Sequence, residues 1–157
     1  MRYTTMESPI GELLLAGDDG GLRRVSMSPF KIDRHCERDD ISLESVRRQL
    51  EQYFSGERRE FDVRLELDGN PFALAVWEAL RRIPYGTTTS YGQIARALRH
   101  PQAPRAVGVA NARNPVAIIV PCHRVIGVDG SLTGYGGGLQ RKRFLLELET
   151  GVLRLTP

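Results

Sequence analysis

The sequence predicts a mixed protein of the α/β (α+β) class, with a small strand-rich N-terminal part followed by a mostly helical C-terminal part. Two observations support this division. Strand-like patterns occupy the first part and helical patterns the second, and the first 70 residues carry a net charge of −4 whereas the remainder carries +7. We expect domains at 1–69 and 70–157, separated at the turn-forming Asp68-Gly69-Asn70-Pro71.

The N-terminal part contains a predicted hairpin, a helix and a further strand. Gly17-Asp18-Asp19-Gly20-Gly21 favours a turn between two apolar segments, Glu12–Ala16 and Leu22–Met27. Ser42 is expected to cap a helix that ends at Gly56, because apolar residues recur between them at helical spacing. Residues 28–41 are expected to form a surface loop. Four apolar residues then alternate with polar ones, as in a half-buried strand: Phe61, Val63, Leu65 and Leu67.

The C-terminal part begins with a helix that Asn70 caps and in which Pro71 occupies the first turn. Ser90 and Gln93 form a capping-box signature for a short helix that continues to Leu98. A second short helix is expected over Arg105–Ala112, so that the pair resembles a helix-turn-helix. The last predicted elements are a glycine loop at 134–138 and a helix over 139–149 that Gly151 terminates.

Arginines dominate one long stretch of the C-terminal part. No acidic residue lies between Glu78 and Asp129. A basic stretch of this kind forms either an ordinary solvated face or a surface suited to phosphates. The stretch contains Arg81, Arg82, Arg96, Arg99, Arg105, Arg113 and Arg124.

The two cysteines differ in their sequence surroundings. Cys122 follows the apolar run 115–120 and precedes His123 and Arg124, so we expect electropositive surroundings that favour the reactive thiolate. A buried structural thiol is the alternative. Cys36 lies beside His35 in a charged segment, where two candidate ligands are weak evidence for a metal. Two cysteines are too few for a disulfide scaffold. No apolar run is long enough to cross a bilayer and no secretory signal is recognised, so an intracellular location is expected.

The motif Pro121-Cys122-His123-Arg124-Val125 resembles the active-site motif of O6-alkylguanine-DNA alkyltransferases, the suicidal methyltransferases of DNA repair. Further family motifs follow the same order from about residue 70 to 150. They are Ser90–Ala95, Arg105–Gly108, Asn114-Pro115, Tyr135–Leu139 and Leu145–Glu149. The resemblance implies a ribonuclease H-like first domain and a winged-helix-like second domain that docks in the minor groove of double-stranded DNA.

The resemblance implies roles for individual residues. Cys122 corresponds to the alkyl acceptor, His123 would draw its proton through a water molecule, Glu149 would hold the histidine, and Asn114 would stabilise the turn. Tyr91 corresponds to a guanine-contacting residue. The other positions matched to substrate or DNA contact are Arg105, which would fill the space of a flipped base, with Ala106, Gly108, Val125, Tyr135, Gly136 and Gly137.

Gly136 departs from relatives that carry serine after the pocket tyrosine, which leaves only a backbone N–H toward O6 and more room for bulky alkyl groups. The N-terminal part has too few Cys and His residues for the zinc site of some relatives, so no metal and no cofactor are expected. The implied activity is irreversible, stoichiometric transfer from O6-alkylguanine, and O4-alkylthymine, by a cytoplasmic monomer without membrane or obligate protein partners.

Two other activities are compatible with the same residues. One is a sequence-tolerant DNA-binding module whose Cys122 is merely buried or redox-active. The other is a Cys-His-Glu hydrolase, although turnover would require an oxyanion site that the sequence does not indicate. DNA carrying labelled O6-methylguanine separates the three, because label would move once to protein, stay on DNA, or appear as excess free product.

Overall fold

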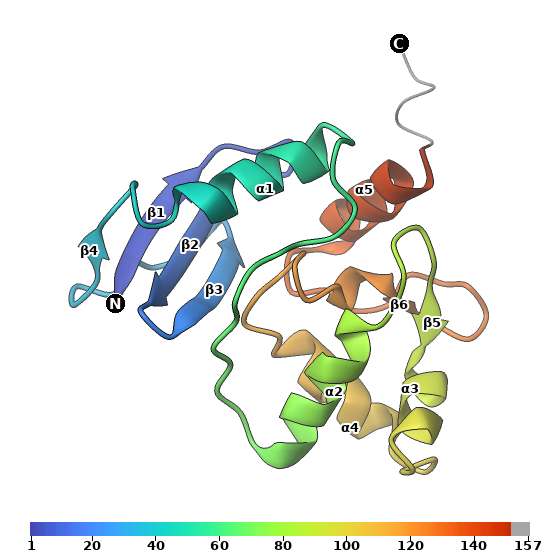
Figure 1. Ribbon diagram of the computed structural model, residues 1–157. Helices are drawn as coiled ribbons and strands as arrows, with labels where there is room; N and C mark the ends of the chain where they lie inside the picture. The colour runs from blue at the N-terminus through green and yellow to red at the C-terminus, as the bar shows by residue number, and fades with distance from the viewer. Residues whose placement is uncertain (152–157) are drawn as a thin grey trace. The chain divides into compact units, whose positions relative to one another are not determined.

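The computed structural model describes residues 1–151 and divides the chain into two compact units. The N-terminal unit comprises Met1–Asp68 with Pro115–Ala117, and the C-terminal unit comprises Gly69–Asn114 with the described chain from Ile118 on. The first contains a sheet and one helix, and the second is mostly helical (Figure 1). This confirms the predicted α/β class. None of the described helices is both long and apolar enough to cross a bilayer.

A four-stranded sheet in the order β3-β2-β1-β4 forms the N-terminal unit. Strands β2 (Leu13–Asp18) and β3 (Gly21–Met27) form the predicted antiparallel hairpin. Strand β1 (Arg2–Met6) pairs antiparallel with β2 on its other side. The apolar residues of β2 are all buried, as its central place in the sheet requires.

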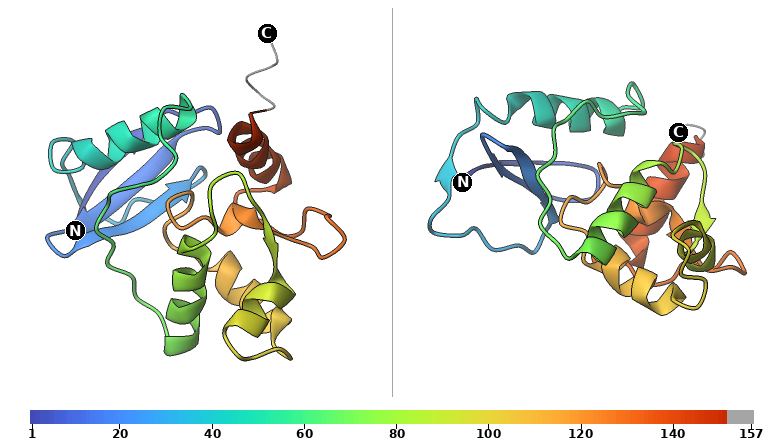
Figure 2. Two further views of the ribbon diagram at one scale, coloured as in Figure 1. Left: turned by 45° about the vertical axis from the view of Figure 1, so that its right-hand side comes forward. Right: turned by 60° about the horizontal axis from the view of Figure 1, so that its bottom comes forward.

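Helix α1 (Glu44–Phe54) runs across one face of this sheet (Figure 2). Val46, Leu50 and Tyr53 are buried, which confirms the apolar spacing expected of the helix. The expected Ser42 cap is wrong, because the N-cap position belongs to Leu43. Asp39 competes for Ser42, whose N–H donates to the Asp39 carboxylate at 3.0 Å and so keeps the serine in the preceding turn.

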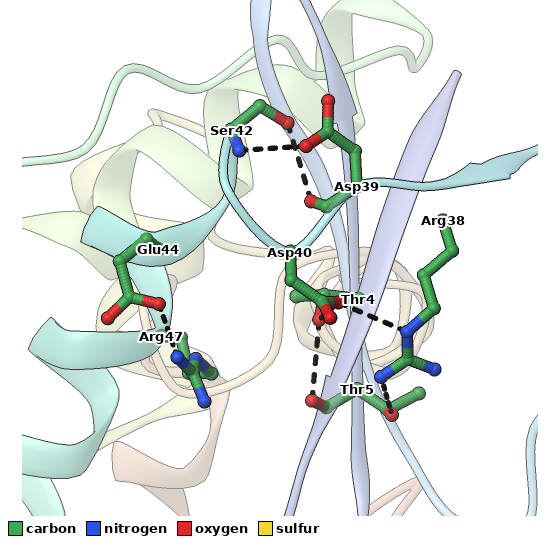
Figure 3. A network of polar contacts seen from close by, with 8 residues as sticks. All are labelled: Thr4, Thr5, Arg38, Asp39, Asp40, Ser42, Glu44 and Arg47. Carbon is green, nitrogen blue, oxygen red and sulfur yellow. Dashed lines mark hydrogen bonds and ion pairs between the residues drawn. The ribbon is translucent and has the colours of Figure 1, made fainter.

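The segment before α1 is attached to the sheet by short-range polar contacts (Figure 3). Strand β4 (Glu37–Arg38), which the expected surface loop did not include, pairs in parallel with β1. The buried Thr4 hydroxyl donates to Asp40 Oδ1 at 2.6 Å, and the same oxygen accepts from Arg38 Nε at 3.1 Å. Arg38 also donates to Thr5 Oγ1 at 3.2 Å. These contacts stabilise β4, whose pairing with β1 extends over only two residues.

The strand expected over residues 61–67 does not form. The side chains alternate between half-buried and exposed at first, but the backbone makes a single bridge, from Leu65 to Leu22. The free edge of β3 is divided between two segments, since Val25 bridges to Val116. Each segment therefore finds backbone partners at one position only, and alternation alone overestimated the pairing.

Helices α2 (Pro71–Arg81), α3 (Tyr91–Ala97) and α4 (Pro104–Ala112) dominate the first half of the C-terminal unit. The Asn70 side chain accepts from Ala73 N at 2.8 Å, and both hydrogen bonds of the Ser90–Gln93 capping box are present. These caps were predicted from the sequence. The two short helices follow one another across a compact turn, as expected.

Two short strands and one long helix complete the C-terminal unit. Strand β5 (Thr89–Ser90) pairs in parallel with β6 (Val125–Ile126), which follows a 3₁₀ turn at Cys122–Arg124. Helix α5 (Leu139–Thr150) then ends at Gly151, whose φ of 83° is the left-handed conformation that glycine accepts. The core of the unit is formed by side chains of α2, α4 and α5 that are fully buried, including Val76, Leu80, Val107 and Leu145.

Candidate active site

The backbone around Cys122 is held by amide side chains. Asn114 Nδ2 donates to the Val120 carbonyl at 2.7 Å, just before the 3₁₀ turn, and Asn111 Nδ2 donates to the Cys122 carbonyl at 3.4 Å. The Cys122 N–H itself donates to the Val120 carbonyl at 2.8 Å. The turn that carries the cysteine is therefore attached to the end of α4 by two asparagines.

The Cys122 thiol is 6% exposed, and its burial raises its pKa above the ordinary value. Three neighbours act in the opposite direction and lower the pKa of the thiol, namely the Asn114 side chain, the charge of Lys142 and the nearby Tyr135 hydroxyl. The expectation that electropositive surroundings favour the thiolate is therefore wrong for the resting protein, because desolvation outweighs the nearby cation. A base is needed to ionise this thiol.

His123 lies fully buried with its Nε2 atom 2.7 Å from Glu149 Oε2. Burial lowers the pKa of His123, and the hydrogen bond with Glu149 opposes this only partly, so the imidazole is neutral at rest. Because the carboxylate is ionised and can only accept, the proton lies on Nε2. Nδ1 is then a free acceptor, and it has no hydrogen-bond partner among residues 1–151.

Glu149 also binds Arg124, which lies in the same buried cluster. Arg124 Nε and one terminal nitrogen donate to the two Glu149 oxygens at 2.8 and 2.9 Å, and the other terminal nitrogen donates to the Ile83 carbonyl at 2.8 Å. Gly86 N–H reaches Glu149 Oε1 at 3.3 Å. Burial alone would raise the pKa of Glu149, but the hydrogen bonds with His123 and Arg124 hold it far below the ordinary value.

Lys142 on α5 is the second buried cation. Its Nζ atom donates to the Val125 carbonyl at 2.5 Å and to the Thr133 carbonyl at 2.8 Å, and the residue is 0% exposed. Burial lowers the pKa of this ammonium group, and the proximity of Cys122 opposes that effect. The lysine thus attaches the loop after β6 to the helix behind it.

An open cleft of about 660 Å³ lies beside this cluster. Helices α3 and α4 contribute Tyr91, Arg105 and Gly108 to its lining, and the loop before α5 contributes Tyr135 and Gly136. The Tyr91 hydroxyl accepts from Thr133 Oγ1 at 3.1 Å, which connects the two sides. The lining does not include Cys122, which lies behind Tyr135.

Tyr135 connects the cleft to the cysteine. Burial raises its pKa well above the ordinary value, and its proximity to Cys122 raises it further, so the hydroxyl keeps its proton. The buried hydroxyl has no hydrogen-bond partner among residues 1–151. Of the other sequence-predicted positions, Val125 is fully buried and Ala106 is exposed. Neither these two nor Gly137 belongs to the cleft lining.

The structure places three polar residues in the site that sequence reasoning did not select. Arg124 was grouped with the basic surface, yet it is 6% exposed, and the other arginines of that stretch are exposed. Lys142 lies between two arginines in a helix, which is typical of a solvated face. Asn111 lies one turn before the sequence-predicted Asn114. No local pattern distinguishes these three from surface residues, because their burial depends on contacts distant in sequence.

Comparisons with known proteins cover both units. The family model of the 6-O-methylguanine DNA methyltransferase ribonuclease-like domain matches residues 1–67, in agreement with the fold expected for the first domain, and the model of the DNA binding domain matches residues 71–151. A methylated-DNA--protein-cysteine methyltransferase of Methanosarcina acetivorans is 53% identical over 154 residues, which cover 95% of this chain and 98% of that protein.

Solved structures agree with these matches. Mycobacterium tuberculosis OGT in complex with DNA superposes with a TM-score of 0.92 at 52% identity, covering 96% of this chain and 94% of that one. An O6-methylguanine DNA methyltransferase of Methanococcus jannaschii gives a TM-score of 0.67 at 28% identity, covering 94% of this chain and 93% of that one. On the strength of both domain matches and the full-length similarity, this chain belongs to the 6-O-methylguanine DNA methyltransferase family.

Proposed function

We propose that this protein repairs DNA directly by moving the alkyl group of O6-alkylguanine, and of O4-alkylthymine, irreversibly onto its own Cys122. The observation that carries the proposal is a buried thiol behind a cleft lined by a helix pair, followed in the chain by a buried histidine that bonds the Glu149 carboxylate of α5. The relatives' name, methylated-DNA--protein-cysteine methyltransferase, supports the same chemistry. Each molecule reacts once, because the thioether that forms is not hydrolysed.

The proton of the thiol leaves first. His123 Nδ1 is the free acceptor of the neutral imidazole, and in the proposed reaction it receives the Cys122 proton through a bridging water. The resulting imidazolium is stabilised by the ionised Glu149, whose own position is fixed by Arg124. Tyr135 and Lys142 lower the cost of forming the sulfur anion inside the protein.

The alkyl transfer itself exchanges one bond for another. The Cys122 sulfur attacks the alkyl carbon, the bond between that carbon and guanine O6 breaks, and its electron pair stays on the guanine. The guanine then takes up one proton and becomes the normal base. Asn114 keeps the turn that presents the sulfur in place during the attack. No metal or cofactor is part of the proposed step.

A base within a duplex cannot reach a thiol that lies behind Tyr135. We therefore include base flipping in the proposal, with the extruded guanine entering the cleft between Tyr91 and Gly136. Arg105, which is exposed at the cleft on α4, is positioned to fill the space left in the stack. Docking of α4 in the minor groove agrees with the small residues Ala106 and Gly108 on this helix.

Duplex DNA containing labelled O6-methylguanine tests the proposal, with Cys122→Ser as the matched variant. We expect label on the wild-type protein at about one methyl per molecule, and mass spectrometry should place it on the Cys122 peptide. The serine variant should bind the same DNA without reacting, since an alcohol ionises far less readily than a thiol. Label on Cys36, an unchanged lesion, or free product in excess over protein would each contradict the proposal.

The proposed cellular setting follows the sequence expectations. We propose that the protein acts as a monomer in the cytoplasm with damaged double-stranded DNA as its partner. Light scattering on the free protein tests the monomeric state, and a stable dimer would contradict it.

A further inference from the structure

Asn111 is a buried residue with an amide side chain in the C-terminal unit. It lies on α4 and is 3% exposed, beside the buried Val107 and Ala110 of the same helix. Its Nδ2 atom donates to the Cys122 carbonyl at 3.4 Å. This orientation of the amide is determined, because a carbonyl can only accept and so must face the NH₂ group.

The other end of this amide has no protein partner. Asn111 Oδ1 is buried and accepts no hydrogen bond from residues 1–151. Buried acceptors of this kind are commonly satisfied by an ordered water molecule. His123 Nδ1 is a second buried acceptor that has no hydrogen-bond partner among residues 1–151, and His123 directly follows Cys122. Two partnerless acceptors therefore lie on residues that contact or adjoin the cysteine.

The two acceptors match the bonding capacity of a single water. A water molecule has two O–H donors, one for each of these atoms, and a lone pair that can accept from the Cys122 S–H. Protein groups that hold a reacting water in one orientation save the cost of orienting it during the reaction. With only His123 as a partner, the water would remain free to turn its lone pairs away from the sulfur.

We propose that Asn111 is a positioning residue that holds, together with His123, the water through which the Cys122 proton leaves. The inference rests on the proposed alkyl transfer at Cys122. In the step, the thiol proton passes to the water oxygen, and the water proton that faces His123 passes to Nδ1. The other O–H stays on Asn111 Oδ1, so the water is regenerated and the products are a thiolate and an imidazolium.

Asn111→Leu tests this role because leucine keeps the approximate size of the side chain and removes both amide atoms. We expect the single-turnover transfer rate at pH 7, with saturating protein, to fall about a hundredfold, at the low end of general-base effects. The deficit should shrink as the pH rises, because hydroxide can then ionise the thiol without the relay. The affinity for DNA should stay within about twofold, since the side chain does not line the cleft.

Gln49→Leu is the matched control in the N-terminal unit. Gln49 is also a buried amide, at 6% exposed, and it bonds the backbone of Asp62 through both its nitrogen and its oxygen. Both variants lose buried amide hydrogen bonds, so they should share a loss of thermal stability. Only Asn111→Leu should change the pH dependence of the rate. A normal rate, or a deficit that is equal at every pH in the folded protein, would overturn the proposal.

A high-resolution crystal structure of the wild-type protein gives a second test that requires neither a folded variant nor any activity. We expect one water within hydrogen-bond distance of both Asn111 Oδ1 and His123 Nδ1. Separate waters on the two atoms, or none, would overturn the proposal. If this water is present but the protein transfers no methyl from O6-methylguanine, the proposed function fails while the hydration site stands.

Discussion

Glu149 illustrates how much one side chain contributes at the scale of single residues. Its carboxylate accepts from His123, from two nitrogens of Arg124 and from the Gly86 N–H. Replacing one partner of a buried ion pair costs more than the pair contributes, because the other charge is left without compensation. The residue therefore supports both the proposed proton relay and the packing of α5.

We predict that Glu149→Gln lowers the free energy of unfolding by about 3–5 kcal/mol, because Arg124 would stay buried without a counter-charge. The pH dependence should change as well. Since the folded protein lowers the pKa of Glu149, its contribution is present above the ordinary value of 4.5 and is lost as the pH falls below it. Denaturant unfolding between pH 3 and 7 measures both effects.

Glu147→Gln is the control for this prediction, since Glu147 lies on the same helix and makes no ion pair among the described residues. It should leave the free energy of unfolding within about 0.5 kcal/mol of wild type. Equal destabilisation by the two variants would show that the cluster around Glu149 contributes nothing specific.

Gly136 is the residue that we expect to set substrate range. A Cβ atom built there would find its nearest neighbour, the Ala112 carbonyl oxygen, at 4.0 Å, so serine fits without displacing backbone. We predict that Gly136→Ser keeps the rate for O6-methylguanine and slows transfer from O6-benzylguanine about tenfold, because the added side chain occupies cleft volume. Single-turnover rates on matched duplexes measure this, with the methyl substrate as internal control. A parallel loss on both substrates would indicate general damage to the cleft.

Helix α4 is the element that contributes both to the proposed DNA contact and to the proposed chemistry at Cys122. Arg105 at its start lines the cleft, and Arg113 at its end is exposed away from the lining. The same helix carries the asparagine that bonds the Cys122 carbonyl. A shift of this helix on binding DNA would therefore change the position of the Cys122 backbone.

We predict that Arg105→Ala slows repair of duplex DNA about tenfold or more at saturating protein, and slows reaction with the free alkylated base much less. The reason is that a free base incurs no unstacking cost, which amounts to a few kcal/mol in a duplex. Arg113→Ala is the matched control, because a phosphate contact affects affinity and drops out at saturation. A normal duplex rate for Arg105→Ala would leave this arginine with an electrostatic role only.

Local sequence signals predicted the elements that depend on them. The Asp-Gly and Gly-Gly steps of the first hairpin and the capping box of α3 act within a few residues, and both formed as expected. Elements that depend on partners distant in sequence were harder to predict. The alternation over residues 61–67 could not show that β3 shares its edge, and Ser42 was displaced as a cap by Asp39.

The candidate site shows the same division. The adjacency of Cys122 and His123 and the late glutamate were apparent from motif resemblance, and the structure brings Glu149 to His123. The burial of Arg124 and Lys142 was not apparent from the sequence. A charged side chain is buried only where several carbonyls or carboxylates, distant in sequence, accept its hydrogen bonds. The raised pKa of Cys122 likewise reflects burial that no neighbouring residue in the sequence reveals.

The net positive charge of the whole molecule comes from the C-terminal part of the chain. The C-terminal part has a net charge of +7 and the first 70 residues −4, and six arginines of the basic stretch are exposed. Phosphate neutralisation by such residues releases counterions, so affinity for DNA should fall steeply with salt.

The slope of log affinity against log salt is negative. We predict that Arg96→Gln combined with Arg99→Gln reduces its magnitude by about 2, because each lost phosphate contact removes the release of about one counterion. Arg48→Gln, an exposed arginine of the N-terminal unit, should leave the slope unchanged. Fluorescence anisotropy with undamaged duplex DNA at several salt concentrations measures it. An unchanged slope in the double variant would remove these two arginines from the DNA interface.

The attachment of Glu149 to Arg124 also bears on how the protein is synthesised. A ribosome completes the reactive cysteine and its histidine well before it reaches the helix that supplies the carboxylate. Until that helix emerges and docks, the nascent chain holds an arginine without its counter-ion and a histidine without its acceptor. Chains interrupted by a premature stop after the cysteine would thus carry the proposed alkyl acceptor in an inert form, and in the proposed single-use reaction the protein is spared reaction before its fold is complete.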